Sequence, residues 1–431
     1  MSNQLKREVS QLGMALLIAA SMTACIEDEL PNINVDITGV TPASGTQGIV
    51  NHTIQENGIT IYADGKKADW GAMQFDFEVS PGATCQYVDV VFNKSYATID
   101  YQGQTYTYEV IDTVITSRPT AFTDYSETRY VKVLAEAVGL RSDDVATASK
   151  FSKFGGIDPE TGRLFKIWSI NVLPANIPTQ LHFDNWFNPF GLVYQHPYEL
   201  VQTQSGQDAK VEIWASTNNS LGVLLDAMYK DQLTASHYGA SPTDEAVRGK
   251  ALRLTTRDIG MFDASKPLVS GCLYIGEFDG HDSDPLTCTH VGLPFDKLPK
   301  KLSFYYKYLP TVIQQTGVAE SAEYAGQLDR GLIRAVLYRA DSQVPYLTGK
   351  NICNNTLDNV IAYAQFIPEG EVKGYTYHEE AFTFVHDYSK EDLKNFKYNL
   401  AIYLASSLNG FTFIGGGDTQ LFIDEMEVEC E

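Results

Sequence analysis

The sequence predicts an all-β protein made of two β-sandwich domains in series. Between residues 33 and 173, about seven short segments show the alternating apolar and polar pattern of half-buried strands, separated by turn residues. Ten more such segments follow between residues 179 and 431, and only two stretches have a helical pattern. Seven strands fit an immunoglobulin-like sandwich, and ten fit a jelly roll.

The chain begins with a segment typical of a secretory leader. Lys6 and Arg7 precede a short apolar run that ends in Met22-Thr23-Ala24-Cys25. The run is shorter than the roughly 20 apolar residues that a membrane-spanning helix needs, and small residues follow it, as at a cleavage site. This ending is similar to the bacterial lipobox, so we expect residues 1–24 to be a lipoprotein signal peptide and Cys25 to carry the lipid. An ordinary signal peptide and a buried helix are the alternatives.

Residues 25–32 form an acidic tether in this interpretation. The run Glu27-Asp28-Glu29 resembles the surface-export tag of lipoproteins in glycan-harvesting Gram-negative bacteria. We therefore expect an outer-membrane lipoprotein that is exposed at the cell surface and touches the membrane only through its anchor. A solvated tether without any export role is the alternative.

The elements of the first domain, residues 33–173, start with a hairpin. Asn57-Gly58 lies between two β-type runs, which is the strongest short hairpin signal. Residues 174–178 contain two prolines and are expected to form a stiff linker. The other expected strands of this domain cover residues 73–79, 87–92, 105–115, 129–135 and 165–172.

The second domain, residues 179–431, has recurrent period-2 segments. Two stretches, 220–229 and 390–396, are expected to form short helices. The expected strands cover residues 180–186, 210–215, 250–256, 271–278, 301–308, 332–338, 358–366, 383–385, 398–405 and 419–429.

The net charge of −22 excludes some classes of partner. Nucleic-acid affinity depends on cationic groups that neutralise phosphates, and anionic lipid surfaces also repel an acidic protein. Neutral sugars are compatible with this charge. Five cysteines remain besides Cys25, and an odd number cannot all pair. Cys272 and Cys288 are expected either to form a disulfide or to be apolar core residues.

From about residue 181 the chain resembles the putative carbohydrate metabolism domain of bacterial lipoproteins. That family implies an immunoglobulin-like domain followed by a jelly roll, and glycan binding or processing without agreed catalytic residues. The segments that carry the resemblance are Phe183-Asp184-Asn185-Trp186, residues 248–256, Leu273-Tyr274-Ile275-Gly276-Glu277-Phe278, Gly292-Leu293-Pro294-Phe295, residues 302–308, Ser406-Ser407 and Leu421-Phe422-Ile423-Asp424-Glu425.

The resemblance favours a glycan-binding accessory protein that works with other surface glycan-uptake proteins and requires no cofactor. A glycoside hydrolase or related carbohydrate-active enzyme is the second hypothesis. A structural or adhesive surface subunit is the third.

Aromatic side chains are the natural platforms for sugar rings, because pyranoses present apolar C–H faces. Trp186 and Phe187 precede an Asn-Pro turn and are expected on a loop, and Trp214 and Tyr305 are further candidates. The alternation of residues 304–308 places Tyr305 opposite to its aromatic neighbours. For each of these side chains, burial in the core is the alternative.

An acidic loop follows the expected strand at residues 271–278. Glycoside hydrolysis needs two carboxylates roughly 5 to 10 Å apart, and Glu277, Asp279 and Asp282 are weak candidates for one of them. The alternative is a solvated turn.

Asp424 is the acid that the pattern singles out. It shares the even positions of the last strand with Phe422, Met426 and Val428, so it is expected in an apolar row. Such a carboxylate needs an Arg partner, backbone donors or a metal. The pairing of Asp184 and Asp424 is similar to the structural Ca²⁺ site of jelly-roll carbohydrate-binding modules, and Ca²⁺ accepts such oxygen ligands.

Overall fold

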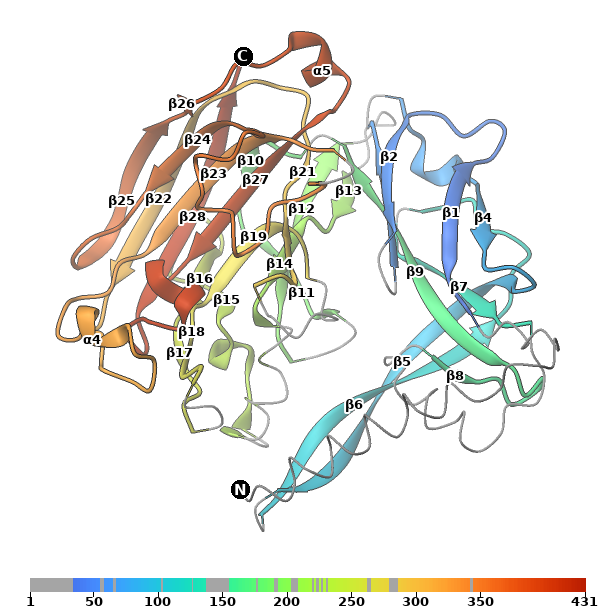
Figure 1. Ribbon diagram of the computed structural model, residues 1–431, viewed down its shortest axis with the longest axis horizontal. Coiled ribbons are helices and arrows are strands. Elements are labelled where there is room, and N and C mark those ends of the chain that lie inside the picture. Colours follow the sequence, from blue (N-terminus) through green and yellow to red (C-terminus); the bar gives the residue numbers. More distant parts are fainter. Residues whose placement is uncertain are drawn as a thin grey trace, which may run out of the picture.

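The computed structural model confirms the all-β prediction and places the first domain (blue to green) beside the second (green to red), as Figure 1 shows. The residues that it describes are 34–54, 58–64, 67–101, 104–125, 127–136, 155–175, 177–189, 193–202, 208–218, 221, 225, 228, 229, 232–261, 265–278, 286–341 and 344–431.

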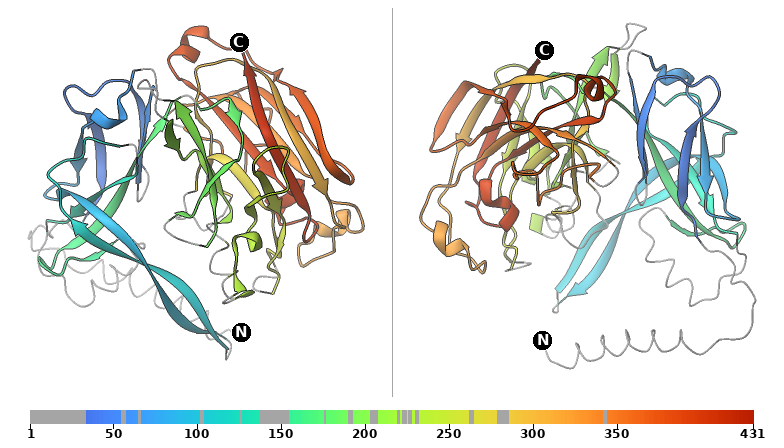
Figure 2. Two further views of the ribbon diagram at one scale, coloured as in Figure 1. Left: turned by 180° about the vertical axis from the view of Figure 1, so that it is seen from behind. Right: turned by 45° about the horizontal axis from the view of Figure 1, so that its top comes forward.

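The first domain contains a large sheet and a two-stranded sheet. The predicted hairpin is present as β2 and β3, which pair antiparallel, whereas β3 and β9 run parallel. The hairpin of β5 and β6 extends away from the rest of its domain (Figures 1 and 2). The large sheet has the order β2(Ile49–Ile54), β3(Gly58–Ala63), β9(Leu164–Pro174), β7(Arg129–Leu134), β5(Thr84–Tyr101), β6(Gln104–Ser117), with β8(Gly155–Ile157) on β9; β1(Ile37–Pro42) pairs with β4(Phe75–Val79).

An apolar core joins these two sheets. Ile37 and Phe75 from the small sheet pack in one cluster with Val131 and Trp168 from the large one. The Trp168 indole donates a hydrogen bond to the Val35 carbonyl at 3.0 Å, which satisfies the polar atom of a buried ring. The sandwich is therefore confirmed, and its immunoglobulin-like topology stays a prediction.

The second domain is built on two facing sheets, and Figure 2 shows their strands from two further sides. The first sheet has the order β15(Ala240–Thr243), β16(Ala251–Thr255), β28(Gln420–Cys430), β22(Pro299–Leu309), β25(Val372–Ala381), with β10(Gln180–Leu181) on β28. The second has the order β14(Trp214–Ser216), β19(Cys272–Phe278), β27(Tyr398–Ala405), β23(Leu332–Arg339), β24(Val360–Phe366), β26(Thr383–Phe384), with β20(Thr289–Val291) on β19 and β21(Leu293–Pro294) on β27.

Small elements complete this domain. Helix α5(Lys390–Lys394) confirms one expected helix, and the Ser389 hydroxyl caps it by accepting from the Asp392 amide at 3.1 Å. Most of the expected helix at residues 220–229 lies outside the described residues. The remaining elements are β11(Asn185–Phe187), β12(His196–Gln202), β13(Asp208–Val211), β17(Arg257–Asp258), β18(Leu268–Val269), α4(Ser321–Tyr324), η4(Ala235–His237) and η5(Leu408–Thr412), with η1(Trp70–Ala72) in the first domain.

The segment expected as a linker is packed into the second domain. Pro174 is the last residue of β9, and the side chains of Ala175 and Ile177 are buried in the jelly-roll core cluster. Tyr62 and Leu173 of the first domain belong to the same cluster. The two domains therefore share apolar contacts on both sides of the expected boundary.

A β-bulge in β28 overturns the expected apolar row around Asp424. The register with β22 shifts where Asp424 pairs with Tyr305, and Glu425 has a φ of 45°. Leu421 and Ile423 face the core before the bulge, and Met426 and Val428 face it afterwards. Asp424 therefore points to the outer face of the sheet, away from the core that holds Met426.

None of the cysteines in the described part of the chain forms a disulfide. Cys272 and Cys288 are both buried and do not form the disulfide considered above. Burial raises the pKa of the Cys272 thiol, as expected for an apolar core residue. Within the described part of the chain, no helix has both the length and the apolar character to cross a membrane. The expected leader, Cys25 and the acidic tether lie outside that part.

Candidate functional site

A cavity of about 440 Å³ lies between the two domains. The first domain contributes Val50 to Thr53 on β2 and Tyr62 on β3. The second contributes residues from four separate segments, which the fold brings together: Glu277, His290, Asp341, Tyr346, Asn395, Lys397 and Asn399.

Glu277 joins the two walls of this cavity. It lies near the end of β19, and the hydroxyl of Thr60 on β3 donates a hydrogen bond to its Oε1 atom. Burial, together with the nearby Glu277 carboxylate, raises the pKa of Tyr62 well above its usual range. Tyr62 therefore lines the cavity as a neutral phenol.

Gly276 allows the close approach that positions Glu277. Its φ is 137°, and a Cβ atom at this position would lie 2.0 Å from the His290 carbonyl oxygen. Only glycine tolerates this backbone geometry without strain. Glu277 then pairs with His290 across β19 and β20, so the carboxylate and the imidazole come from neighbouring strands.

The cavity contains a stacked ring pair. The rings of His290 and Tyr346 lie 3.6 Å apart between centroids, with an interplanar angle of 16°. His290 is buried and Tyr346 is half-buried, so the pair has a fixed orientation and keeps part of its surface accessible. A flat ring surface of this kind is suited to the apolar face of a small cyclic ligand.

Hydrogen bonds also hold the strand and the loop around this ring pair. The Asn399 amide donates to the Tyr338 hydroxyl at 3.0 Å and to the Pro345 carbonyl at 3.1 Å. The Tyr338 hydroxyl in turn donates to the Val291 carbonyl at 2.9 Å. Strand β27 is thereby tied to the loop that carries Tyr346.

On the wall that the first domain forms, partial burial lowers the pKa of His52, which favours its neutral form.

The aromatic residues singled out from the sequence lie outside this cavity. Trp214 is 5% exposed and packs in the core, where its indole donates to Glu199 at 3.1 Å. The expected loop position of Trp186 and Phe187 is wrong, because both lie on strand β11, which pairs with β12. Trp186 is half-buried and donates to the Phe183 carbonyl at 2.6 Å. The ring of Phe187 lies under the Lys210 ammonium, 3.6 Å from its centroid.

Tyr305 lies on the outer face of the first jelly-roll sheet. Its neighbours Phe304 and Tyr306 are buried in the core, as the alternation predicted. Of the three weak catalytic candidates, Glu277 lines the cavity, and Asp279 and Asp282 lie outside the described residues.

Asp184 and Asp424 bind the same loop through backbone amides. One carboxylate oxygen of Asp424 accepts from the Val247 amide at 2.7 Å and the Arg248 amide at 3.0 Å, and the other accepts from Glu425 at 2.8 Å. Asp184 accepts from the Lys250 amide at 2.9 Å. The described residues contain no group of three or more His, Cys, Asp or Glu placed to hold a metal.

The hydrogen bonds of Asp184 and Asp424 affect whether these two acids can bind the expected calcium ion. The two acids supply few of the six to eight oxygen ligands that Ca²⁺ takes, and backbone amides already bind both oxygens of Asp424 and one of Asp184. Burial raises the pKa of Asp424, and the three backbone amides act against that rise. The geometry fits a hydrogen-bonded carboxylate better than a Ca²⁺ ligand, and calcium binding stays a prediction.

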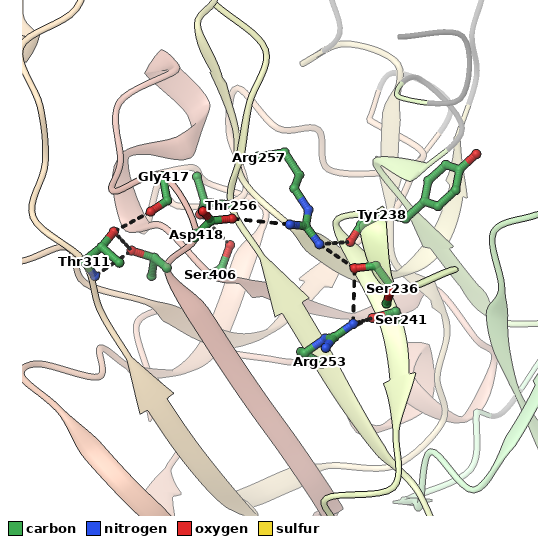
Figure 3. A network of polar contacts seen from close by, with 11 residues as sticks. Ser236, Tyr238, Ser241, Arg253, Thr256, Arg257, Thr311, Ser406, Gly417 and Asp418 are labelled. Atoms are coloured by element: carbon green, nitrogen blue, oxygen red, sulfur yellow. Dashed lines mark hydrogen bonds and ion pairs between the residues drawn. The ribbon is translucent and has the colours of Figure 1, made fainter. Parts of the chain in front are cut away.

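A polar network lies around β16 and β17 of the jelly roll, and Figure 3 shows it. The guanidinium groups of Arg253 and Arg257 both donate to the Ser236 carbonyl, at 3.2 and 2.6 Å. Thr256 and Ser406 exchange a hydrogen bond of 2.8 Å between hydroxyls. The network connects β16 and β17 to the loops before β15 and after β27, which is a structural role.

The comparisons with known proteins agree with this architecture. The family model of the putative carbohydrate metabolism domain matches residues 182–429. A crystal structure named as a putative glycoside hydrolase from Bacteroides thetaiotaomicron is 25% identical, with a TM-score of 0.64, and the match covers 94% of this chain and 99% of that one. A second, from Bacteroides vulgatus and named likewise, is 27% identical with a TM-score of 0.50, covering 59% of this chain and 99% of that one. No curated protein matches the chain.

Proposed function

Since the chain belongs to the putative carbohydrate metabolism domain family, we propose that it binds a glycan in the cavity between its two domains. A carbohydrate-related function follows from the family. The observation that supports this particular site is the combination of a stacked ring pair, His290 and Tyr346, with amide and carboxylate groups in one cavity.

The chemistry of the cavity suits a neutral sugar. Stacking on Tyr346 would desolvate an apolar pyranose face, and Asn395 and Glu277 offer groups that bind sugar hydroxyls. The net charge of −22 acts against anionic polysaccharides at a distance. The proposed ligand is therefore a neutral oligosaccharide.

A glycan array followed by isothermal titration calorimetry tests the proposal. Tyr346→Ala should weaken binding of the selected oligosaccharide by about tenfold or more, because flat aromatic side chains dominate binding energetics. Phe384→Ala is the matched control, since Phe384 is 44% exposed on a strand outside the cavity. Equal affinities of Tyr346→Ala and wild type would contradict the proposed site.

Glycoside hydrolysis is the second candidate function, and one observation favours it. Glu277 and Asp341 are both in the cavity lining, and hydrolysis of a glycosidic bond needs an acid and a second carboxylate. Release of reducing ends from an oligosaccharide, lost in both Glu277→Gln and Asp341→Asn, would support an enzyme. If the wild type binds the oligosaccharide without hydrolysing it, the result would support the accessory role. If it neither binds nor hydrolyses the oligosaccharide, the structural or adhesive subunit would remain as the hypothesis.

The proposed setting is the outer surface of the cell. Cys25 would carry the lipid, and the acidic residues after it would direct export. The protein would then present glycans to neighbouring uptake proteins, with the membrane contacted only by the anchor.

A further inference from the structure

The outer face of the first jelly-roll sheet carries a pair of tyrosines, of which Tyr377 is exposed and Tyr305 is half-buried. Tyr305 on β22 and Tyr377 on β25 are cross-strand partners, and their ring centroids lie 5.2 Å apart at an interplanar angle of 55°. Tyr377 is 49% exposed, whereas Phe304 and Tyr306 on the other face of β22 are buried. Two large rings are thus held side by side at the surface.

Polar neighbours hold the exposed member of the pair, Tyr377. The Tyr377 hydroxyl donates to Glu379 at 2.6 Å, and the same carboxylate accepts from Lys301 at 2.9 Å. Lys301 also lies 3.0 Å from Glu429 on β28. Side chains that are already ordered lose little conformational entropy when a ligand stacks on them.

A clamped loop borders the pair on one side. Asp424 is the cross-strand partner of Tyr305, and its outward carboxylate binds the amides of Val247 and Arg248. The same loop is joined to the sheet by Glu245, which contacts Lys307 through its carboxylate and accepts from the Tyr375 hydroxyl at 2.6 Å through its carbonyl. The loop therefore forms a wall beside a floor of two tyrosines.

From these observations we propose a second glycan-binding site, formed by Tyr305 and Tyr377, for the neutral chain of a polysaccharide whose other part occupies the cavity. The proposal rests on the proposed function and adds a site on another face of the same domain. Two rings cover at most about 500 Å², which is well below the ~800 Å² that each partner of a stable protein interface contributes. Exposed Glu427 and Glu429 next to the pair disfavour anionic ligands.

Native affinity electrophoresis on the whole protein tests the second site. The probes are soluble neutral polysaccharides: a β-glucan, an arabinoxylan, a galactomannan and an α-glucan, with polygalacturonate as the anionic comparison. Tyr305→Ala/Tyr377→Ala should weaken binding to the retained neutral polysaccharide by on the order of tenfold, since loss of one of two linked sites removes avidity. Phe384→Ala should migrate as the wild type does.

Titration with a short fragment of the same polysaccharide separates the two sites. The wild type should bind two fragments per chain, and the double variant should bind one with unchanged affinity at the cavity. Tyr377→Ala alone, at a surface position, serves if the double variant unfolds, and Tyr377→Phe should retain binding because it keeps the ring.

The outcomes distinguish this inference from the proposed function. Unchanged stoichiometry and affinity in the tyrosine variants, with binding lost in Tyr346→Ala, would overturn the second site only. A change in sedimentation coefficient in Tyr377→Ala would identify a protein interface instead and would also overturn it. If the wild type binds none of the probes, both proposals fail.

Discussion

Thr60 of the first domain donates a hydrogen bond to the carboxylate of Glu277 in the second domain, across 217 positions of sequence. The contact is part-buried and lies in the wall of the cavity. A ligand in the cavity therefore meets a carboxylate whose position depends on both domains.

We expect Thr60→Val to lower the free energy of unfolding by about 1 to 3 kcal/mol, because a partly buried carboxylate loses a donor. The same change should weaken binding of the selected oligosaccharide, since Glu277 then loses the hydrogen bond from the first domain that positions it. Chemical denaturation and calorimetric titration measure the two effects. Thr60→Ser, which keeps the hydroxyl, is the control, and a Thr60→Val protein that behaves as the wild type does in both assays would show that the contact is unimportant.

His196 should make stability depend on pH in a defined window. Burial lowers its pKa from 6.5 to about 4, so the unfolded chain takes up a proton before the folded protein does. The contribution of His196 to stability is therefore complete above pH 6.5 and is lost as pH falls toward 4, by about 3 kcal/mol in total.

Comparison with His196→Gln isolates this effect. Burial raises the pKa of Glu199, so that residue favours the folded state as pH falls and acts in the opposite direction. Denaturation curves between pH 4 and 7 should show a smaller loss of stability on acidification for His196→Gln than for the wild type. If the free energy of unfolding of His196→Gln and of the wild type fell equally with pH, His196 would not be the residue responsible.

Asp424 and Asp184 offer a test between backbone hydrogen bonds and calcium. The hydrogen bonds predict that Asp424→Asn lowers the free energy of unfolding by about 1 to 3 kcal/mol, whether or not Ca²⁺ is present, because amide donors lose a charged acceptor. Melting curves with millimolar Ca²⁺ and with a chelator measure this. A Ca²⁺-dependent rise in melting temperature that disappears in both Asp424→Asn and Asp184→Asn would establish the metal.

Trp214→Ala should cost about 3 to 5 kcal/mol of stability, because a large buried side chain leaves a cavity behind. Its loss also removes the indole that donates to Glu199. Trp186→Ala tests whether Trp186 binds sugar, since this side chain is half-buried and stays a candidate platform. Reduced glycan affinity with unchanged melting temperature would support that role, and reduced stability alone would contradict it.

Metabolic labelling tests the lipid anchor. Radioactive palmitate should label the wild-type protein and not Cys25→Ala, since the proposal places the acyl chains on Cys25. Extracellular protease should then digest the protein on intact cells, as surface export predicts. Equal labelling of both proteins would contradict the lipid anchor at Cys25. Protection from the protease until the outer membrane is permeabilised would contradict surface exposure.

The strands could be predicted from the sequence because their patterns are local. The Asn57-Gly58 turn and the alternation of residues 301–308 correspond to β2, β3 and β22. Strand β25, Val372–Ala381, was not predicted because it lies at the edge of its sheet and few of its side chains are buried. Its sequence is therefore mostly polar and lacks a clear alternation of apolar and polar residues.

The cavity could not be predicted in this way. His52, Glu277, Tyr346 and Asn399 come from segments with no local signal in common, and only the packing of two domains brings them together. Glu277 was found for its acidity alone, as one of several candidates. The Trp214 side chain was misleading because an aromatic residue in a strand has the same pattern whether it faces sugar or core.

The bulge at Glu425 changes which positions of β28 face the core. Odd positions face the core before it and even positions face the core after it. Deleting Glu425 would restore a regular alternation in which Ile423, Met426 and Val428 all still face the core, whereas deleting Glu427, after the bulge, would exchange the faces that follow and place Glu429 in the interior and Val428 in water. A single-residue deletion in this strand should therefore be far more damaging after the bulge than at Glu425 itself.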